Sequence, residues 1–296
     1  MDYRDHVFLV VAQNLSFSKA ANELCISQPA VSKHMQELER KADIVLFERK
    51  GNRIELTKAG QVRFNYLSKI KQIYHELDYE LSLLKETMKG KLRVGASSTI
   101  AQYVVPSLMA SFLKQYSGIT LDLKSGNSFD MEQKLLYDDI DIALVENHRS
   151  LSGISYVPFM DDEIVAITSC KSPFAKASKI SIDDIRKMPI VVREKGSGTL
   201  EVIQKVFQEN DLDYNALNII MHLGSTEAIK NFVPNIDVVG FVSEKAVIKE
   251  LRNEDLIKLE IEGLKINRSF RIARKQGAIT GLTDIFYNFL LNRTSV

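Results

Sequence analysis

The spacing of apolar residues divides this chain into two parts. Up to about residue 88 they mostly recur at intervals of three and four, which predicts helices. From Leu92 onward, short apolar runs such as LRVGA and ITLDL alternate with helical stretches, which predicts α/β architecture. The Lys89-Gly90-Lys91 segment lies at the change and is the best candidate for a hinge. We therefore expect an α+β multi-domain protein.

Composition narrows the classes that fit. The chain has 296 residues, of which 45% are hydrophobic and 26% charged, as in a globular protein of two or three domains. The net charge is +1, so a nucleic-acid site must come from local placement of basic residues. Two cysteines exclude a disulfide framework and fit a reducing compartment. With neither a signal-peptide pattern nor an apolar stretch of about 18 residues, we expect a cytoplasmic protein that does not span a membrane.

Three helices are predicted at the start of the chain. Residues 3 to 13 form the first, and Ser16 or Ser18 can cap the second, which carries KAANEL. Ser27 can cap the third helix, where Pro29 is tolerated in the first turn because its missing N–H is not needed there. The buried stripe of this third helix is expected to be Val31, Met35 and Leu38.

The opposite face of the third helix is polar and carries Pro29, Ser32, Lys33, Gln36 and Arg40. Such side chains can bond base edges or phosphates, and a tight turn before such a helix gives the docking geometry of a helix-turn-helix. The following ADIVLFERKGNRIELT predicts two strands around a turn, a wing with Arg49, Lys50 and Arg53 at its tip. The alternative is a three-helix bundle with a solvated face, since residues 1 to 60 carry nine Lys and Arg against eight Asp and Glu.

The segments SFSKAANELCISQPAVSKHMQELE and LFERKGNRIELTKAG resemble the N-terminal signature of the bacterial LysR-type transcriptional regulators almost position for position. The resemblance implies that the third helix faces the major groove and that Arg49 and Arg53 approach the backbone or minor groove. We therefore predict a winged helix-turn-helix over residues 1–58 that binds double-stranded promoter DNA. Its predicted DNA-binding residues are Ser18, Lys19, Ser27, Gln28, Pro29, Ser32, Lys33, Gln36, Arg49, Lys50 and Arg53.

A long linker helix is predicted to begin after Thr57 and to end near Met88. Its apolar residues follow the a/d pattern of a two-helix seam, namely Leu67, Ile70, Tyr74, Leu77, Leu81 and Leu84. The stripe could instead be buried within one chain, but we expect residues 59–89 to form a dimer that places two DNA-binding domains on neighbouring half-sites. The LysR resemblance implies a homodimer or homotetramer.

Residues 90–296 are predicted to form an effector-binding domain. Strands are expected at LRVGA, ITLDL, IDIAL, EIVAITS, PIVVR, NIIMHL and DVVGFV, with helices over 100–116, 129–138, 181–187, 199–210 and 226–232. NRSFRIARK and a helix over 282–292 would return the chain to its first half. This layout resembles the two-lobed effector domain of the family, which is like periplasmic solute-binding proteins. We place lobe I at about 90–160 and 266–296, and lobe II at about 161–265.

Polar residues gather where predicted strands meet helices, in GASSTIAQY, SGNSFD, REKGSGTLEV and LGSTEAIKN. Ligands of such sheets bind at the carboxyl ends of strands, beside helix N-termini. Each hydroxyl alone could be a helix cap, but junctions from both lobes point to a shared site. The family resemblance implies effectors at the first and third of these segments. The predicted effector-binding residues are Ser97, Ser98, Thr99, Asn127, Ser128, Gly196, Ser197, Thr199, Ser225 and Thr226.

Hydroxyls beside helix N-termini favour a small anion or carboxylate. GSGT resembles a subgroup of sulfur- and carbon-metabolism regulators in which arginine usually follows, but Leu200 stands at that position. Glu146 would repel an anion unless the ligand also carried an amine. We therefore expect a small polar or anionic effector, such as a carboxylate, an inorganic anion or an amino-acid-like molecule.

The sequence shows no catalytic or metal-binding motif. GSGT lacks the Lys-Ser/Thr of a P-loop, the histidines are scattered singly, and no nucleophile elbow is present. Cys170 could suggest peroxide sensing, but it has no second cysteine in its domain, and Cys25 is expected to be a small buried thiol. We predict no enzyme, no cofactor and no metal, but a transcription factor that contacts RNA polymerase. The alternatives are a two-lobed solute-binding protein or transferase without a DNA role, and a constitutive DNA-binding protein.

Overall fold

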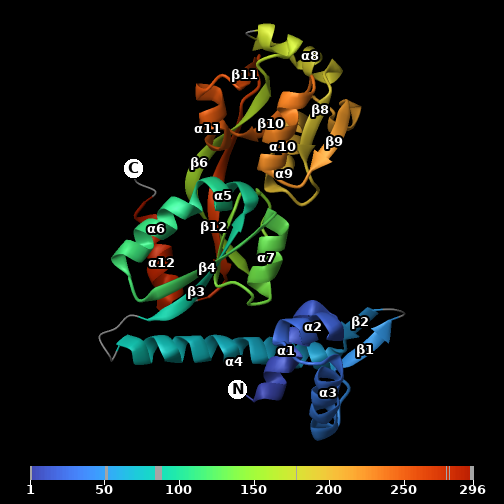
Figure 1. Cartoon of the computed structure of the whole chain (residues 1–296), viewed down its shortest axis with the longest axis vertical. Helices are drawn as coiled ribbons and strands as arrows, with labels where there is room; N and C mark the ends of the chain where they lie inside the picture. Colours follow the sequence, from blue (N-terminus) through green and yellow to red (C-terminus); the bar gives the residue numbers. More distant parts are fainter. Residues whose placement is uncertain are drawn as a thin grey trace. The chain divides into compact units, whose positions relative to one another are not determined.

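The computed structural model in Figure 1 describes residues 2–50, 53–83, 89–177, 179–277, 279 and 281–293. The chain consists of two compact units, Met1–Thr87 and Met88–Val296. No helix in the described ranges is long and apolar enough to cross a membrane.

The first unit is a winged helix-turn-helix followed by a long helix. Its elements are α1 (Tyr3–Asn14), α2 (Phe17–Leu24), α3 (Gln28–Ala42), β1 (Phe47–Lys50), β2 (Arg53–Leu56) and α4 (Lys58–Leu83). Ser16, not Ser18, caps α2, and Ser27 caps α3 by accepting from the Ala30 N–H at 3.3 Å. The core of the unit includes Phe8, Val11, Ala20, Val31, Met35 and Leu38. The predicted stripe of α3 is therefore confirmed as its buried face.

A tight turn at Cys25 joins α2 to α3. Cys25 adopts the left-handed conformation, with φ of 55°, and its N–H bonds the last carbonyls of α2. The prediction that this thiol is buried was wrong: because Cys25 lies where the chain reverses direction outside the core, its side chain is exposed.

The wing is fixed to α3 and α4 by a few specific contacts. β1 and β2 pair antiparallel, and the Glu39 carboxylate of α3 accepts from the Leu46 and Phe47 N–H groups at 2.7 and 3.2 Å. The Thr57 hydroxyl caps α4 by accepting from the Gly60 N–H at 3.0 Å. A Cβ on Gly60 would lie 2.1 Å from the Leu46 carbonyl oxygen, so only glycine permits this close approach.

An apolar stripe lies exposed along α4. Ile70, Tyr74, Leu77 and Leu81 are each 40–48% exposed. Leu67 is only 7% exposed and packs in the core of this unit, so it lies apart from the stripe. Leu84, also predicted for dimerisation, lies outside the described residues.

The second unit is built on one mixed sheet that serves two lobes. The strands are β3 (Gly90–Ser97), β4 (Ile119–Gly126), β5 (Ile142–Val145), β6 (Ile154–Ser169), β7 (Lys179–Ile180), β8 (Ile190–Arg193), β9 (Ile219–Leu223), β10 (Val239–Ser243), β11 (Leu256–Ile261) and β12 (Ile266–Lys275). Their order is β4-β3-β5-β12-β6-β10-β8-β9, with β11 between β6 and β7. The long antiparallel strands β6 and β12 run between the lobes (Figure 1), so they form the crossover that joins the two lobes.

Helices cover both lobes. Lobe I carries α5 (Ser98–Tyr103), α6 (Val105–Gln115), α7 (Ser128–Leu136) and α12 (Gly281–Leu291), and lobe II carries α8 (Ile182–Lys187), α9 (Gly198–Glu209), α10 (Thr226–Phe232) and α11 (Glu244–Arg252). Short 3-10 turns occupy Pro173–Lys176, Tyr214–Ala216 and Val233–Asn235. Parallel strands β3, β4 and β5 form lobe I, and parallel strands β8, β9 and β10 form much of lobe II. Each lobe therefore directs the carboxyl ends of its parallel strands toward helix N-termini.

Some elements differ from the predictions. The predicted helix over 100–116 is two helices that meet at Val104, because Pro106 cannot donate a backbone N–H to a continuous helix. β6 begins at Ile154, nine residues before the predicted EIVAITS. α11 and β11 were not predicted.

Candidate DNA-binding and effector-binding sites

The exposed face of α3 is polar from its first residue. Gln28, Pro29, Lys33 and Gln36 are exposed, and Ser32 is half-buried. Gln28 Nε2 donates to Ser32 Oγ at 2.9 Å, one helical turn away. Because the opposite stripe of α3 is fixed in the core, this face is held rigidly and is free to enter a groove of DNA.

The other predicted DNA-binding residues flank α3. Ser18, Lys19 and Ser27 are exposed at α2 and at the following turn, and Arg49 and Lys50 are exposed on the wing. Lys50 Nζ lies 2.6 Å from the Glu55 carboxylate, a hydrogen bond that raises the pKa of Lys50. The side chain of Arg53 lies outside the described residues.

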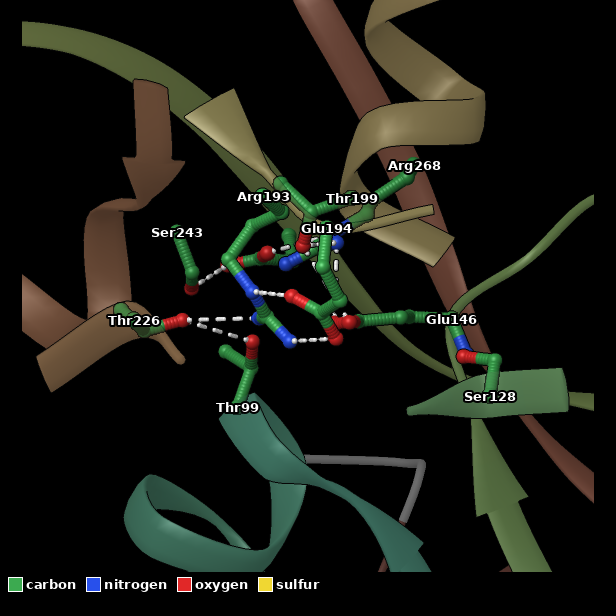
Figure 2. A network of polar contacts seen from close by, with 10 residues as sticks. Thr99, Ser128, Glu146, Arg193, Glu194, Thr199, Thr226, Ser243 and Arg268 are labelled. Atoms are coloured by element: carbon green, nitrogen blue, oxygen red, sulfur yellow. Dashed lines mark hydrogen bonds and ion pairs between the residues drawn. The ribbon is translucent and has the colours of Figure 1, made fainter. Parts of the chain in front are cut away.

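The ends of three strands of the second unit, β3, β8 and β9, meet at the boundary between the lobes. The Oγ1 atoms of Thr99 at α5 and Thr226 at α10 lie 3.2 Å apart, and neither side chain is more than 1% exposed (Figure 2). Arg193, the last residue of β8, donates from Nη1 to Thr226 Oγ1 at 3.3 Å. Its Nε and Nη2 atoms contact the two carboxylate oxygens of Glu194 at 2.8 and 2.9 Å. The predicted hydroxyls of both lobes therefore meet beside a buried guanidinium.

A second buried arginine lies next to the GSGT loop. Arg268 of β12 donates from Nε to Asp162 at 2.8 Å and from Nη1 to Thr199 Oγ1 at 2.9 Å. Its Nη1 also lies 2.9 Å from Glu146 Oε2, although off the hydrogen-bond direction, while Thr199 donates to the other oxygen of Glu146. Glu146 was predicted to repel an anion unless the ligand also carried an amine; Arg268 offsets that repulsion in part, because it shares its one positive charge between Glu146 and Asp162.

Several buried donors in this region lack a partner among the described residues. They are Ser97 Oγ, Ser98 Oγ, Ser197 Oγ and Arg268 Nη2. Ser97 and Ser197 sit at the N-cap positions of α5 and α9, yet neither hydroxyl makes the capping bond. A buried donor without a partner costs about 1–3 kcal/mol, so the region is suited to a ligand rich in acceptors.

The remaining predicted residues serve the local structure. Asn127 and Ser225 cap α7 and α10 by accepting from Asp130 and Ala228 N–H groups, so the alternative role as caps applies to them. Ser128 Oγ accepts from the Glu146 N–H at 3.3 Å. Gly196 has φ of +90°, and an added Cβ would lie 3.2 Å from the Asn127 amide nitrogen. The GSGT loop is thus packed directly against the loops of lobe I.

A solvent-open groove of about 760 Å³ runs beside the GSGT loop. Its walls include Phe129 of lobe I, and Gly196, Ser197 and Leu200 of lobe II. The cationic side chains at the groove are Arg149 and Lys195. Glu201 also lines the groove and lies 3.3 Å from Arg149, so Lys195 supplies the excess positive charge beside the Ser197 loop.

Arg193 and Arg268 were missed by the sequence analysis. Arg193 ends the apolar strand PIVVR, and Arg268 lies within the strand NRSFRIARK. Both side chains are less than 5% exposed. A charge at such a position needs a partner, and that signal could have indicated them. In the described part of the chain, no three His, Cys, Asp or Glu residues are placed to hold a metal ion.

Comparison with known proteins defines the class. Residues 6–61 match the model of the bacterial regulatory helix-turn-helix protein of the lysR family, and residues 85–295 match the LysR substrate binding domain. The transcriptional activator CmpR of Synechocystis sp. is 32% identical over 286 residues, covering 96% of this chain and 93% of that protein. A probable RuBisCO transcriptional regulator of Cyanidioschyzon merolae is 35% identical over 265 residues, covering 88% of each.

A solved structure is also similar to the second unit. The regulatory domain of CcmR from Synechocystis PCC6803, in complex with 2-PG (2-phosphoglycolate), is 27% identical with a TM-score of 0.63, covering 70% of this chain and 98% of that one. The chain belongs to the LysR family of transcriptional regulators. It is a transcriptional regulator with a DNA-binding helix-turn-helix and an effector-binding domain, which confirms the predicted family, fold class and function and excludes a two-lobed protein without a DNA role.

Proposed function

We propose that this regulator binds promoter DNA as a dimer through α3 and the wing, and that a small oxyanion bound between its lobes modulates that binding. The proposal of an oxyanion as effector rests on the buried donors without a partner at the lobe boundary and on the buried guanidinium of Arg193. Donors without acceptors favour a ligand with several anionic oxygens. The 2-PG of the CcmR complex, with a phosphate and a carboxylate, supports this class.

The proposed division of labour follows the predicted boundaries. Residues 1–58 bind DNA, residues 59–89 pair two chains through the exposed stripe of α4, and residues 90–296 bind the effector. The stripe is a suitable seam because an exposed apolar row of this length is stabilised by a second helix. Contact with RNA polymerase at the promoter, location in the cytoplasm and the absence of enzymatic activity belong to the same proposal.

The mechanism is a difference in ligand affinity between two arrangements of the lobes. Ser97, Ser98 and Thr99 belong to lobe I, whereas Ser197 and Thr226 belong to lobe II. A ligand that contacts both sets binds most tightly when the lobes approach each other, so it stabilises that arrangement of β6 and β12. The two arrangements also differ in their affinity for DNA in this proposal, so effector binding changes DNA affinity and, by linkage, DNA changes effector affinity by the same factor.

Calorimetric titration of the full chain tests this proposal. We expect 2-phosphoglycolate or another small oxyanion to bind, and choline, a cation, not to bind. The double variant Ser98→Ala/Thr226→Val should weaken binding at least about tenfold, since each contact with a charged ligand is worth about 1.5–3 kcal/mol. Ser111→Ala is the matched control, because among the described residues its hydroxyl bonds only the Ser107 carbonyl on α6. Equal affinities for the double variant and the wild type would overturn the proposed site.

A further inference from the structure

The two buried arginines differ in how their charges are balanced. Arg268 faces Asp162 and Glu146, two carboxylates that are at most 1% exposed and come from other parts of the sheet. The one ion pair of Arg193 within the described residues is with its chain neighbour Glu194, whose side chain is 28% exposed. Arg268 is therefore part of a permanent buried network, whereas Arg193 has a single carboxylate partner that reaches solvent.

The Glu194 carboxylate approaches Arg193 as a bound anion would. Its two oxygens take the Nε and Nη2 edge of the guanidinium, the two-pronged geometry by which arginine binds carboxylates and phosphates (Figure 2). The third nitrogen, Nη1, contacts Thr226, which in turn contacts Thr99 of lobe I. Glu194 thus occupies an anion position directly beside the hydroxyls of both lobes.

Arg193 is held more rigidly than Glu194. Arg193 belongs to β8, which pairs with β9 and β10, and its carbonyl oxygen lies 3.1 Å from His222 Nδ1. Glu194 begins the loop to α9, which continues through Gly196 in the left-handed conformation. Its side chain bonds only Arg193 among the hydrogen bonds of the described residues. The arginine is fixed, whereas the Glu194 carboxylate can rotate toward solvent. Its departure leaves a buried guanidinium without a carboxylate partner, so the exchange requires an incoming anion that offsets this cost.

We infer that Glu194 is an internal substitute for the effector, and that the effector's carboxylate or phosphate displaces it from Arg193. This inference rests on the proposed function. It adds that Glu194 competes with the effector for Arg193 and that the effector binds there through a carboxylate or phosphate. A carboxylate, phosphate or sulfate offers two anionic oxygens to the fork, whereas a neutral polar molecule brings no negative charge to replace that of Glu194 and is disfavoured at this position. Glu194 lowers affinity for all anions and keeps the site occupied when effector is scarce.

Removal of the competing carboxylate tests the inference. In the full-length Glu194→Gln variant, we expect 2-phosphoglycolate to bind about ten- to a hundredfold more tightly than in the wild type, the worth of one charge-assisted contact. Asp183→Asn is the matched control: Asp183 also pairs with an arginine of lobe II, Arg186 at 2.7 Å, but at 73% exposure on α8. The control should bind within about twofold of the wild type.

The outcomes separate this inference from the proposed function. Binding to the wild type with equal or weaker binding to Glu194→Gln overturns the inference alone. Binding to Glu194→Gln with none detectable to the wild type supports it. No binding of 2-phosphoglycolate, phosphate or sulfate to either protein overturns both.

A melting experiment gives a second readout. Glu194→Ala leaves the guanidinium of Arg193 buried and unpaired, so the variant should melt below the wild type without ligand. Saturating 2-phosphoglycolate should restore most of that loss and should raise the melting temperature of Glu194→Ala more than that of the wild type. An equal rise in both proteins contradicts displacement.

Discussion

Replacement of Arg268 by methionine tests whether its buried ion pairs stabilise the junction of the lobes. The guanidinium is 0% exposed and lies between Glu146 and Asp162, which are 1% and 0% exposed. Methionine retains much of the volume but leaves two buried carboxylates without a cation. Loss of one partner of a buried pair costs about 3–5 kcal/mol, and burial excludes the solvent screening that would reduce this figure.

The expected change in melting temperature follows from the size of the unit. For a domain of about 200 residues, 1 kcal/mol corresponds to about 2–4 °C, so Arg268→Met should melt about 6–20 °C below the wild type. Circular dichroism or calorimetry of the full chain measures this directly. Arg186→Met, which breaks a surface pair with Asp183, should cost at most about 1 kcal/mol.

A triple variant separates charge from packing. Glu146→Gln and Asp162→Asn added to Arg268→Met remove the unpaired charges, so most of the lost stability should return. A loss below about 2 °C for Arg268→Met alone, or no recovery in the triple variant, would refute the assignment of this network as a buried ion-pair junction.

Three further predictions concern DNA binding, pairing and lobe contact. Ser32→Ala together with Lys33→Ala should weaken operator binding in gel shifts at moderate salt while the melting temperature stays unchanged; an unaltered shift would remove α3 as the contact face. Leu77→Asp places a charge in the α4 stripe and should lower the dimer fraction in sedimentation, and an unchanged mass would place the dimer seam elsewhere. Gly198→Ala would put a Cβ 2.6 Å from Glu146 Cγ, so it should reduce effector affinity, and full affinity would show that the lobes need not approach this closely.

Local sequence patterns were sufficient for most of the fold. The helix-turn-helix could be predicted because caps, a proline in the first helical turn and the periodic stripe of α3 all act within a few residues. The first half of β6 could not: ISYVPFM contains Pro158 and lacks clear alternation, and it is a strand because it pairs along β12 more than 100 residues later. One helix was predicted where the structure has α5 and α6, because the prediction did not take into account that Pro106 interrupts a continuous helix.

In the effector site too, features set by local sequence were predictable and contacts between distant residues were not. The hydroxyls of Thr99 and Thr226 were predicted because strand-to-helix junctions are visible in sequence. Arg268 was not, because its partner Asp162 lies 106 positions earlier and only the crossover of β6 and β12 brings them together. Residue type alone did not separate Ser197, whose hydroxyl is partnerless, from Ser225, which caps a helix.

Footprinting of the full chain on the DNA upstream of its own gene, with and without 2-phosphoglycolate, tests most directly whether an anion between the lobes controls DNA binding. We expect two protected half-sites about one helical turn or a multiple apart, and a changed pattern of protection when the anion is added. The Ser98→Ala/Thr226→Val variant should protect the same DNA but need at least about tenfold more anion for the same change. Protection of no DNA at any concentration, or an identical footprint with every oxyanion tested, would contradict this.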